Sequence, residues 1–336
     1  MADSKDPGTR ATGEAVQEAA KKPDGVQYVQ VSQPLDSSGN PQPIKASEYY
    51  DKPPGGSNWV KKVVGHKPNP NYSTAERDKM LENSVTTRRD IILRAPSCAT
   101  RFAETAFAHG AMSRTINDER AARRFYMMGV DYAMAGYQAI VAPKERIFFP
   151  WEGAPQIADA SKPEESDYPG PMKWAEAFSI AVALRRSDGI AILSRFPIHF
   201  GRGYDAIWNP LLQAYQRFVL NDPSWSPLAA EATSLAPTAR KSSPKNIARY
   251  MSMVPTMHAI AARDAAAFRD ALVDMLKAHK AEKSRGADKD RGRSGFAEIA
   301  TGLAALGVDR GLPLEVESEY LPAWMVLGTE PENTGE

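Results

Sequence analysis

Three glutamates near the end of the chain have a spacing that could support acid–base chemistry. Glu315, Glu317 and Glu319 occupy alternate positions in the stretch LPLEVESEYLPAW, a pattern typical of an edge strand. Two carboxylates can act as general acid and base when their surroundings push their pKa values apart. Nothing in the sequence indicates which of these, or of the adjacent pair Glu164 and Glu165, would keep its proton at neutral pH. The carboxylates therefore favour a charged surface over a catalytic pair.

The histidines, glycines and serines also lack a catalytic or metal-binding pattern. The five histidines show neither i,i+4 pairing nor a neighbouring cysteine, and Cys98 is the only cysteine. The segment GRGYD, residues 201–205, lacks the preceding strand and the Lys-Ser/Thr ending of a phosphate loop, so it predicts a turn. No Gly-x-Ser-x-Gly elbow is present. We expect a protein that is not an enzyme and that has no catalytic residue, no metal and no cofactor.

The composition predicts a soluble protein with a substantial core. The chain has 336 residues, 42% of them hydrophobic, and a formal net charge of +1. No overall charge therefore points to nucleic acid, a membrane surface or an acidic substrate. A single cysteine favours a reducing compartment. Because the N-terminus lacks the apolar core of a secretion signal and no run approaches about 18 apolar residues, we expect a cytoplasmic protein with no membrane partner.

The charges are nevertheless unevenly distributed along the chain. Residues 235–293 contain 13 lysines and arginines against six acids, whereas residues 294–336 contain eight acids and one arginine. The basic stretch permits nucleic-acid binding, but it has few aromatic residues and no known docking motif, so a solvated helix face is favoured. The polarised ends suit complementarity to a charged protein partner.

We expect three regions along the chain. Residues 1–72 contain nine prolines and seven glycines and predict a largely disordered tail, although Tyr49, Tyr50 and the run NWVKKVV could dock on the folded body. Residues 73–328 predict one helical domain, and residues 329–336 an acidic C-terminal tail. Residues 142–170 and the charged stretch 283–293 predict irregular loops, and Ser187 with Gly189 predicts a break between helices.

Helical periodicity dominates after Ser73. Apolar residues recur at steps of three and four after capping aspartates at Asp118 and Asp264, and Pro171 stands where a helix can begin. His279 lies on the apolar stripe of the helix that follows Asp264, which predicts a buried structural histidine. The fold class we predict is all-α, either an antiparallel multi-helix bundle or a solenoid-like stack of helix pairs, with a short extended C-terminal segment.

Three segments, in this order, resemble the immunity protein 49 family. They are MKWAEAFSIAVALRRSDGIAIL, FRDALVDMLKAHKAEK and FAEIATGLAALGVDRGLPLEVESEYLPAWMV, the last ending in an acidic Glu-Val-Glu-Ser-acid-Tyr-Leu-Pro signature. The resemblance covers roughly residues 75–327. It implies a bacterial, cytoplasmic antidote of a polymorphic toxin system, which binds a cognate protein toxin encoded by an adjacent gene and neutralises it by non-covalent occlusion. The family-signature or partner-binding residues that it suggests are Glu315, Glu317, Ser318, Glu319, Tyr320, Leu321, Pro322, Trp174, Arg186, Asp188, His279 and Lys280.

Two interpretations of the acidic signature stay open. Leu314, Val316 and Leu321 would pack the C-terminal segment against the last helices, with Tyr320 and Pro322 directing its exit. Alternatively, the three glutamates would face basic groups in a toxin. Two other functions also stay open: a non-catalytic helical scaffold or adaptor, suggested by possible helix stacking and by the N-terminal region, and a nucleic-acid-associated protein, suggested by the basic stretch. Nucleic acid is the less favoured partner.

Overall fold

The computed structural model describes residues 73–83, 87–143, 146–151, 154–158, 169–284 and 293–331, together with the backbone of residues 28–30 and 59–63. These residues are predominantly helical, so the all-α prediction is confirmed. The helices are α2 (Thr74–Asn83), α3 (Arg89–Arg94), α4 (Ala99–Thr115), α5 (Glu119–Val141), α6 (Pro171–Ala183), α7 (Ser187–Leu193), α8 (Trp208–Val219), α9 (Trp225–Leu235), α10 (Pro244–Met251), α11 (Met253–Ala262), α12 (Ala265–Lys283), α13 (Glu298–Asp309) and α14 (Ala323–Leu327).

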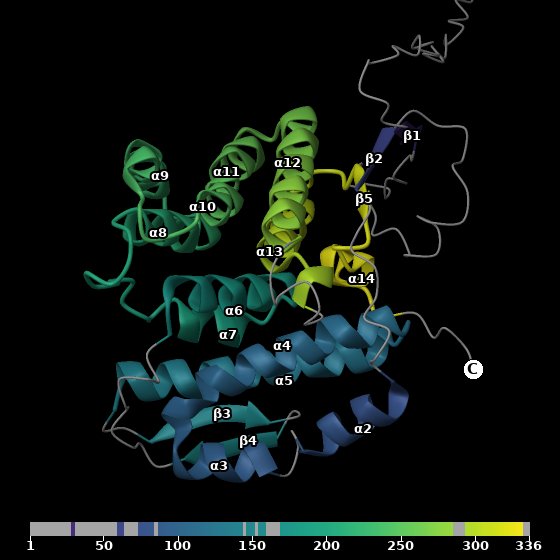
Figure 1. Ribbon diagram of the computed structural model, residues 1–336, viewed down its shortest axis with the longest axis vertical. Helices are drawn as coiled ribbons and strands as arrows, with labels where there is room; N and C mark the ends of the chain where they lie inside the picture. Colours follow the sequence, from purple (N-terminus) through teal and green to yellow (C-terminus); the bar gives the residue numbers. More distant parts are fainter. Residues whose placement is uncertain are drawn as a thin grey trace, which may run out of the picture.

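The helices pack as pairs that form layers (Figure 1). The α4–α5 pair crosses the molecule, with α6 and α7 on one side of it and a small hairpin with α3 on the other. On the far side of α6 lie the pairs α8–α9 and α11–α12, and α13 packs on α6. This arrangement places the start of α5 beside the C-terminal segment, which is the relationship that shapes the candidate site.

Local signals explain where the principal helices begin. The side chains of Asp118 and Asp264 accept hydrogen bonds from Ala121 N and Ala267 N, at 2.8 and 2.9 Å, and so satisfy amides that α5 and α12 leave unpaired. Pro171 is the first residue of α6, where its missing N–H costs nothing. These three predicted helix starts are confirmed.

Two glycines allow neighbouring helices to approach closely. A Cβ on Gly302 of α13 would lie 2.7 Å from the carbonyl oxygen of Ser179 on α6, and one on Gly189 of α7 would lie 3.0 Å from Val130 of α5. The predicted break between helices lies at residues 184–186, between α6 and Ser187, the first residue of α7, whereas Gly189 lies within α7. Gly189 was misassigned because a helical glycine that serves packing looks like a turn residue in sequence.

The predicted irregular region 142–170 contains an antiparallel hairpin of β3 (Ile147–Trp151) and β4 (Ala154–Ala158). Ile147, Phe149 and Trp151 are buried on one face, whereas Phe148 and Ile157, which oppose each other across the strands, are exposed. The strands are short and contain Pro150 and Pro155, which weaken a strand signal in sequence. The prediction of a wholly irregular loop was therefore wrong for these ten residues.

The extended C-terminal segment includes β5 (Val316–Ser318), which pairs in parallel with β2 (Trp59–Val63) and lies at the edge of a sheet completed by β1 (Tyr28–Gln30). The edge strand suggested by alternation in LPLEVESEYLPAW is confirmed over these three residues. The pairing brings part of the NWVKKVV run against the folded body. The remainder of the N-terminal region, including Tyr49 and Tyr50, most of the 283–293 loop and residues 332–336 lie outside the described residues.

Candidate functional site

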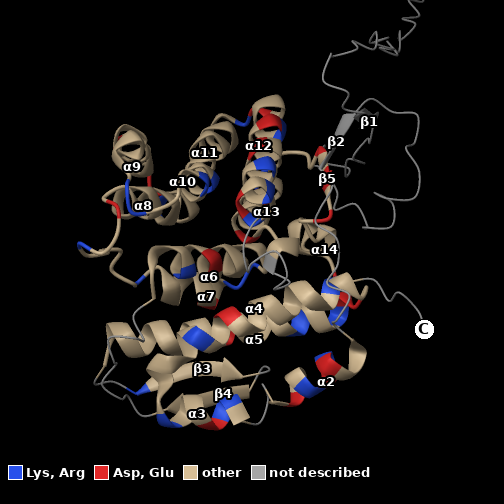
Figure 2. Ribbon diagram, viewed as in Figure 1, with Lys and Arg blue, Asp and Glu red and all other residues tan. Residues whose placement is uncertain are grey.

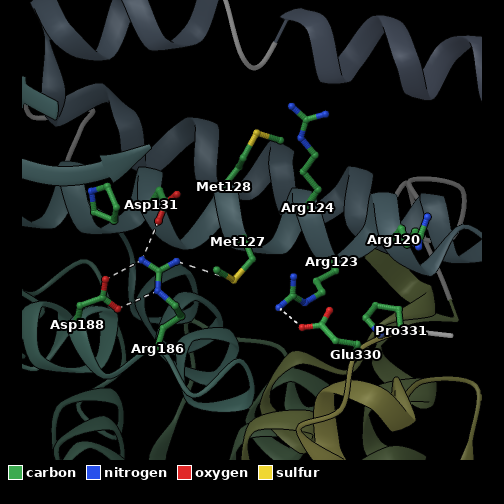
Figure 3. Close-up of a pocket in the computed structure, with 11 residues that line it drawn as sticks. Arg120, Arg123, Arg124, Met127, Met128, Asp131, Arg186, Asp188, Glu330 and Pro331 are labelled. Carbon is green, nitrogen blue, oxygen red and sulfur yellow. Dashed lines mark hydrogen bonds and ion pairs between the residues drawn. The ribbon is translucent and has the colours of Figure 1, made fainter. Parts of the chain in front are cut away.

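A groove of about 780 Å³ runs along the N-terminal half of α5 (Figure 3). Its other walls come from the start of α7, from the hairpin and from the C-terminal segment. It is lined by Arg120, Arg123, Arg124, Met127, Met128, Asp131, Pro150, Arg186, Asp188, Glu330 and Pro331. Four arginines and three carboxylates among these residues make it a strongly charged surface feature, and Figure 2 shows basic residues where the α4–α5 pair meets the C-terminal segment.

Helical spacing brings the α5 residues of the groove together. Steps of three and four from Arg120 to Arg123, Arg124, Met127 and Asp131 place these side chains on one side of the helix. Arg120 and Arg124 are exposed, whereas Met127 is half-buried. Arg123 donates a 2.9 Å hydrogen bond to the carboxylate of Glu330, beyond α14.

The other end of the groove is organised by Arg186. Its Nε and Nη2 donate to the two carboxylate oxygens of Asp188, each at 2.8 Å, and Nη2 also donates to Asp131 at 2.9 Å. Burial disfavours the guanidinium charge, but the two aspartates outweigh this effect and raise the pKa of Arg186. The hydrogen bond from Arg186 is the main reason why the pKa of Asp188 is lowered. Two of the residues suggested by the sequence, Arg186 and Asp188, therefore lie in the groove.

The signature residues of the C-terminal segment are largely engaged with the fold. The Tyr320 side chain is fully buried, and its ring lies 5.0 Å from the imidazole of His279 in an edge-on arrangement. His279 Nε2 lies 3.2 Å from the Ser294 carbonyl oxygen, and the Tyr320 carbonyl accepts a 3.1 Å bond from Ala297 N. His279 is thus buried on the apolar stripe, as predicted, and it meets Tyr320 from a distant part of the chain.

Other members of the signature divide between the core and the surface. Val316, Ser318, Leu321, Leu314 and Pro322 are buried, which agrees with the packing interpretation of this segment. Ser318 Oγ accepts a 3.2 Å hydrogen bond from Tyr320 N, which fixes the turn after β5. Lys280, which follows His279 on α12, is exposed.

The three alternating glutamates do not share one environment. The carboxylate of Glu315 lies 3.3 Å from Arg269 of α12, and burial raises its pKa although Arg269 partly offsets the effect. Glu317 is half-buried and Glu319 is exposed. The backbone carbonyl of Glu319 accepts a 2.9 Å hydrogen bond from Arg114 of α4. The three glutamates therefore differ in exposure, and two of them contact arginines of different helices.

Trp174 has a position in the core between α6 and α7. Its Nε1 donates to the carbonyl of Leu193 at 3.1 Å, and its ring stacks on Phe178 at 4.7 Å. The side chain is fully buried. The contact with Leu193 ties the end of α7 to α6, so Trp174 helps to position the helix that carries Asp188 without itself reaching the groove.

A buried ionic cluster surrounds Arg249, and no sequence pattern had indicated it. This residue of α10 lies 2.8 Å from Glu298, 3.7 Å from Glu176 and 3.4 Å from Glu282. Arg249 is 4% exposed and Lys283 is 7% exposed, so the expectation of a solvated helix face was wrong for these two members of the basic stretch. Burial, and then the nearby Glu176, raise the pKa of Glu298 to about 7 although Arg249 and Lys283 oppose the shift.

The described residues provide no support for a metal centre or a membrane-spanning helix. Within these ranges, no group of three or more His, Cys, Asp or Glu side chains could hold a metal ion. No helix in the same part of the chain has the length and apolarity needed to cross a bilayer.

The fold and the groove together define an all-α protein with a charged surface groove and a closely packed C-terminal signature. The family model described as Immunity protein 49 matches residues 83–325, and the chain belongs to this family. The resemblance inferred from the three sequence segments is therefore confirmed over most of the chain. No curated protein and no solved structure matches it.

Proposed function

We propose that this member of an immunity-protein family binds a cognate protein toxin in the cytoplasm and neutralises it by non-covalent occlusion. The observation that carries the proposal is the family match over residues 83–325, which includes the groove residues from Arg120 to Asp188 and the whole acidic signature. The toxin is expected to be the product of an adjacent gene.

Neutralisation by binding requires a preorganised surface and no bond-breaking group. The groove supplies such a surface, because Arg186 is held by two aspartates and α5 is capped by Asp118. An interface of about 1,600 Å² with a few well-packed anchors is enough for nanomolar affinity. A helical protein of this kind can therefore occlude a toxin stably, and it needs no catalytic step to do so.

Co-expression tests the proposal directly. The full chain is produced with the toxin from the adjacent gene, and growth is followed while an affinity tag on the toxin recovers any complex. We expect growth to be restored and the two proteins to co-purify. Loss of growth despite normal levels of the chain, together with no recovered complex, would contradict the proposal.

A truncation separates this function from that of a scaffold acting through its N-terminal region. The family match begins at residue 83, so a chain without residues 1–72 is expected to keep protecting, provided that its thermal unfolding shows it is folded. A scaffold that binds its partner through the N-terminal region would lose the partner in the same experiment.

A further inference from the structure

The loop between α7 and α8 contains the segment GRGYD, which belongs to neither the groove nor the acidic signature. Gly201, Arg202, Gly203 and Tyr204 are all exposed, and none of them lines the groove. Figure 1 shows this loop extending beyond the helices, and Figure 2 shows basic residues on it. The amide of Tyr204 donates a 3.1 Å hydrogen bond to the carbonyl of Gly201, so the turn predicted for this segment is confirmed.

Asp205 anchors one end of this loop. It is buried, and its carboxylate accepts hydrogen bonds of 2.6–2.9 Å from the backbone amides of residues 240–242, just before α10. The ammonium group of Lys241 donates in return to the carbonyl oxygens of Arg202 and Tyr204. The segment before α10 therefore supports the tip of the loop from beneath.

The other end of the loop is held by side chains of α8. Asn209 Oδ1 accepts a 2.7 Å hydrogen bond from Phe200 N, and Asn209 Nδ2 donates to Phe200 O at 3.3 Å. Gln213 Nε2 donates to the carbonyl of Ile198 at 2.9 Å. With both ends fixed, the loop is preorganised, and a partner that binds it loses little free energy in ordering it.

Positive charge predominates in the loop and in the segment that supports it. Residues 198–205 and 236–246 contain four lysines and arginines and one acid, the buried Asp205. The four basic residues, all of them exposed, are Arg202, Arg240, Lys241 and Lys245. Within the described ranges the side chains of the last three donate to backbone carbonyl oxygens, which carry no net charge, and none pairs with the Arg202 guanidinium.

We propose that this loop inserts into an acidic cleft of the toxin, with Arg202 as its charged anchor and Tyr204 as its aromatic anchor. The inference rests on the proposed function and names the chemistry of the partner surface. Arginine and tyrosine are among the residues that contribute most to protein interfaces. Carboxylates in the cleft would accept charge-assisted hydrogen bonds from the guanidinium, and the surrounding cations would steer the toxin towards the loop.

The two glycines beside Arg202 agree with insertion into a cleft. Neither Gly201 nor Gly203 has a positive φ, and a Cβ added to either would meet no described atom within 4 Å. The described fold therefore does not require glycine at these positions. The absence of two side chains keeps the tip narrow on both sides of Arg202, so that the walls of a cleft can approach its backbone.

The shape of the loop favours a protein cleft over a nucleic acid. Proteins hold single-stranded nucleic acid in a positively charged groove that follows its backbone. In this chain the cations lie instead on a projecting loop and the segment beneath it. A narrow projection is complementary to a concave surface, and its charge indicates that this surface is acidic.

Charge reversal at the tip tests the proposal on the full chain. Isothermal titration calorimetry measures the affinity of the chain for the purified toxin encoded by the adjacent gene. Arg202→Glu should weaken binding by at least about tenfold, whereas the matched reversal Lys277→Glu, at an exposed site on α12, should change it less than about twofold. Both variants replace exposed side chains and should unfold at the wild-type temperature. Wild-type affinity in Arg202→Glu, or equal weakening by the two variants, would overturn the proposal.

The double variant Gly201→Ala/Gly203→Ala distinguishes insertion into a cleft from contact with a flat surface. The added methyl groups meet no described atom, and alanine restricts the unfolded chain, so the unfolding temperature should equal or exceed that of the wild type. Toxin binding should nevertheless weaken by at least about fivefold, because the walls of the cleft would meet the methyl groups. Wild-type affinity in this variant would contradict insertion.

A labelled ten-nucleotide single-stranded DNA tests the alternative partner by fluorescence anisotropy. We expect the wild type and Arg202→Glu to bind this DNA equally weakly. Binding that is tighter than toxin binding and that Arg202→Glu abolishes would identify the loop as a nucleic-acid site and overturn the proposal.

The wild-type titration distinguishes failure of this inference from failure of the proposed function. If the wild type and Arg202→Glu bind the toxin equally well, the loop assignment is wrong while the proposed function stands. If the wild type does not bind the toxin, the proposed function is wrong and the loop assignment fails with it.

Discussion

The guanidinium of Arg186 lies 2.9 Å from the carboxylate of Asp131, and this ion pair joins the start of α7 to the middle of α5. The Asp131 side chain is 4% exposed, whereas Asp188, the second partner of Arg186, is 47% exposed. The two aspartates therefore hold the same guanidinium from environments of different polarity, and their contributions to stability should differ.

Asp131→Asn should lower the free energy of unfolding by about 1–3 kcal/mol, because it leaves a partly buried guanidinium with one carboxylate fewer. Asp188→Asn removes a solvent-screened carboxylate and should cost less than about 1 kcal/mol. Urea unfolding of the two variants measures the difference. Equal losses, or a neutral Asp131→Asn, would show that the buried pair does not hold α7 on α5.

Gly302→Ala tests the close contact between α13 and α6. The added methyl would lie 2.7 Å from the backbone oxygen of Ser179, which cannot move without shifting the helix. We expect a loss of about 2–3 kcal/mol in unfolding free energy. Gly295→Ala is the matched control, because its methyl meets no atom of the described residues within 4 Å. A Gly302→Ala protein as stable as the control would mean that the helices are less closely packed.

Glu298 should make stability depend on pH in a defined direction. Its pKa is raised from 4.5 to about 7 in the folded protein, chiefly by burial and then by Glu176. Between pH 4.5 and about pH 7, Glu298 keeps its proton in the folded protein but loses it in the unfolded chain. The contribution of Glu298 to stability therefore falls as pH rises through this range, and it levels off above pH 7. The decline should be about 3 kcal/mol at most.

Glu298→Gln removes the titrating group and should flatten this decline. Urea unfolding at several pH values between 4.5 and 8 compares the variant with the wild type, so that other titrating groups largely cancel. An equal decline in both proteins, or a wild type that gains stability over this range, would contradict the raised pKa.

The signature residues should separate by role. Tyr320→Ala removes a buried ring that packs on His279 and should cost about 3–5 kcal/mol, whereas the Glu317→Ala/Glu319→Ala double variant should change unfolding free energy by less than about 1 kcal/mol. The packing interpretation predicts that the double variant still protects against the toxin. Loss of protection by a stable double variant would instead favour the interpretation in which these glutamates face the toxin.

The sequence predicted those parts of the fold that local chemistry determines. Asp118 and Asp264 each cap a helix whose apolar stripe is visible within about 20 residues, so neither needed tertiary information. The β3–β4 hairpin was missed because its prolines and short strands resemble a loop. Gly189 was misassigned because its role depends on Val130 of another helix.

The candidate site was less accessible from the sequence. The i, i+3, i+4 spacing of Arg120, Arg123 and Arg124 was visible, but only the fold shows that Glu330 and Arg186 close a groove around that helix face. The burial of Arg249 depends on carboxylates from α6, α12 and α13, which no local pattern brings together. Arg186 and Asp188 were found through the family resemblance, and their place in the groove followed from the structure.

The central claim is that the chain acts by stoichiometric binding and not by catalysis. The most direct test adds increasing amounts of the purified full chain to the purified toxin and measures the remaining toxin activity. The toxin concentration is kept well above the dissociation constant of the complex. Binding predicts that toxin activity falls linearly and reaches its minimum at a fixed ratio of the two proteins close to their ratio in the isolated complex. Progressive inactivation of the toxin by far less than a stoichiometric amount of the chain, or no inhibition at any ratio, would contradict the claim.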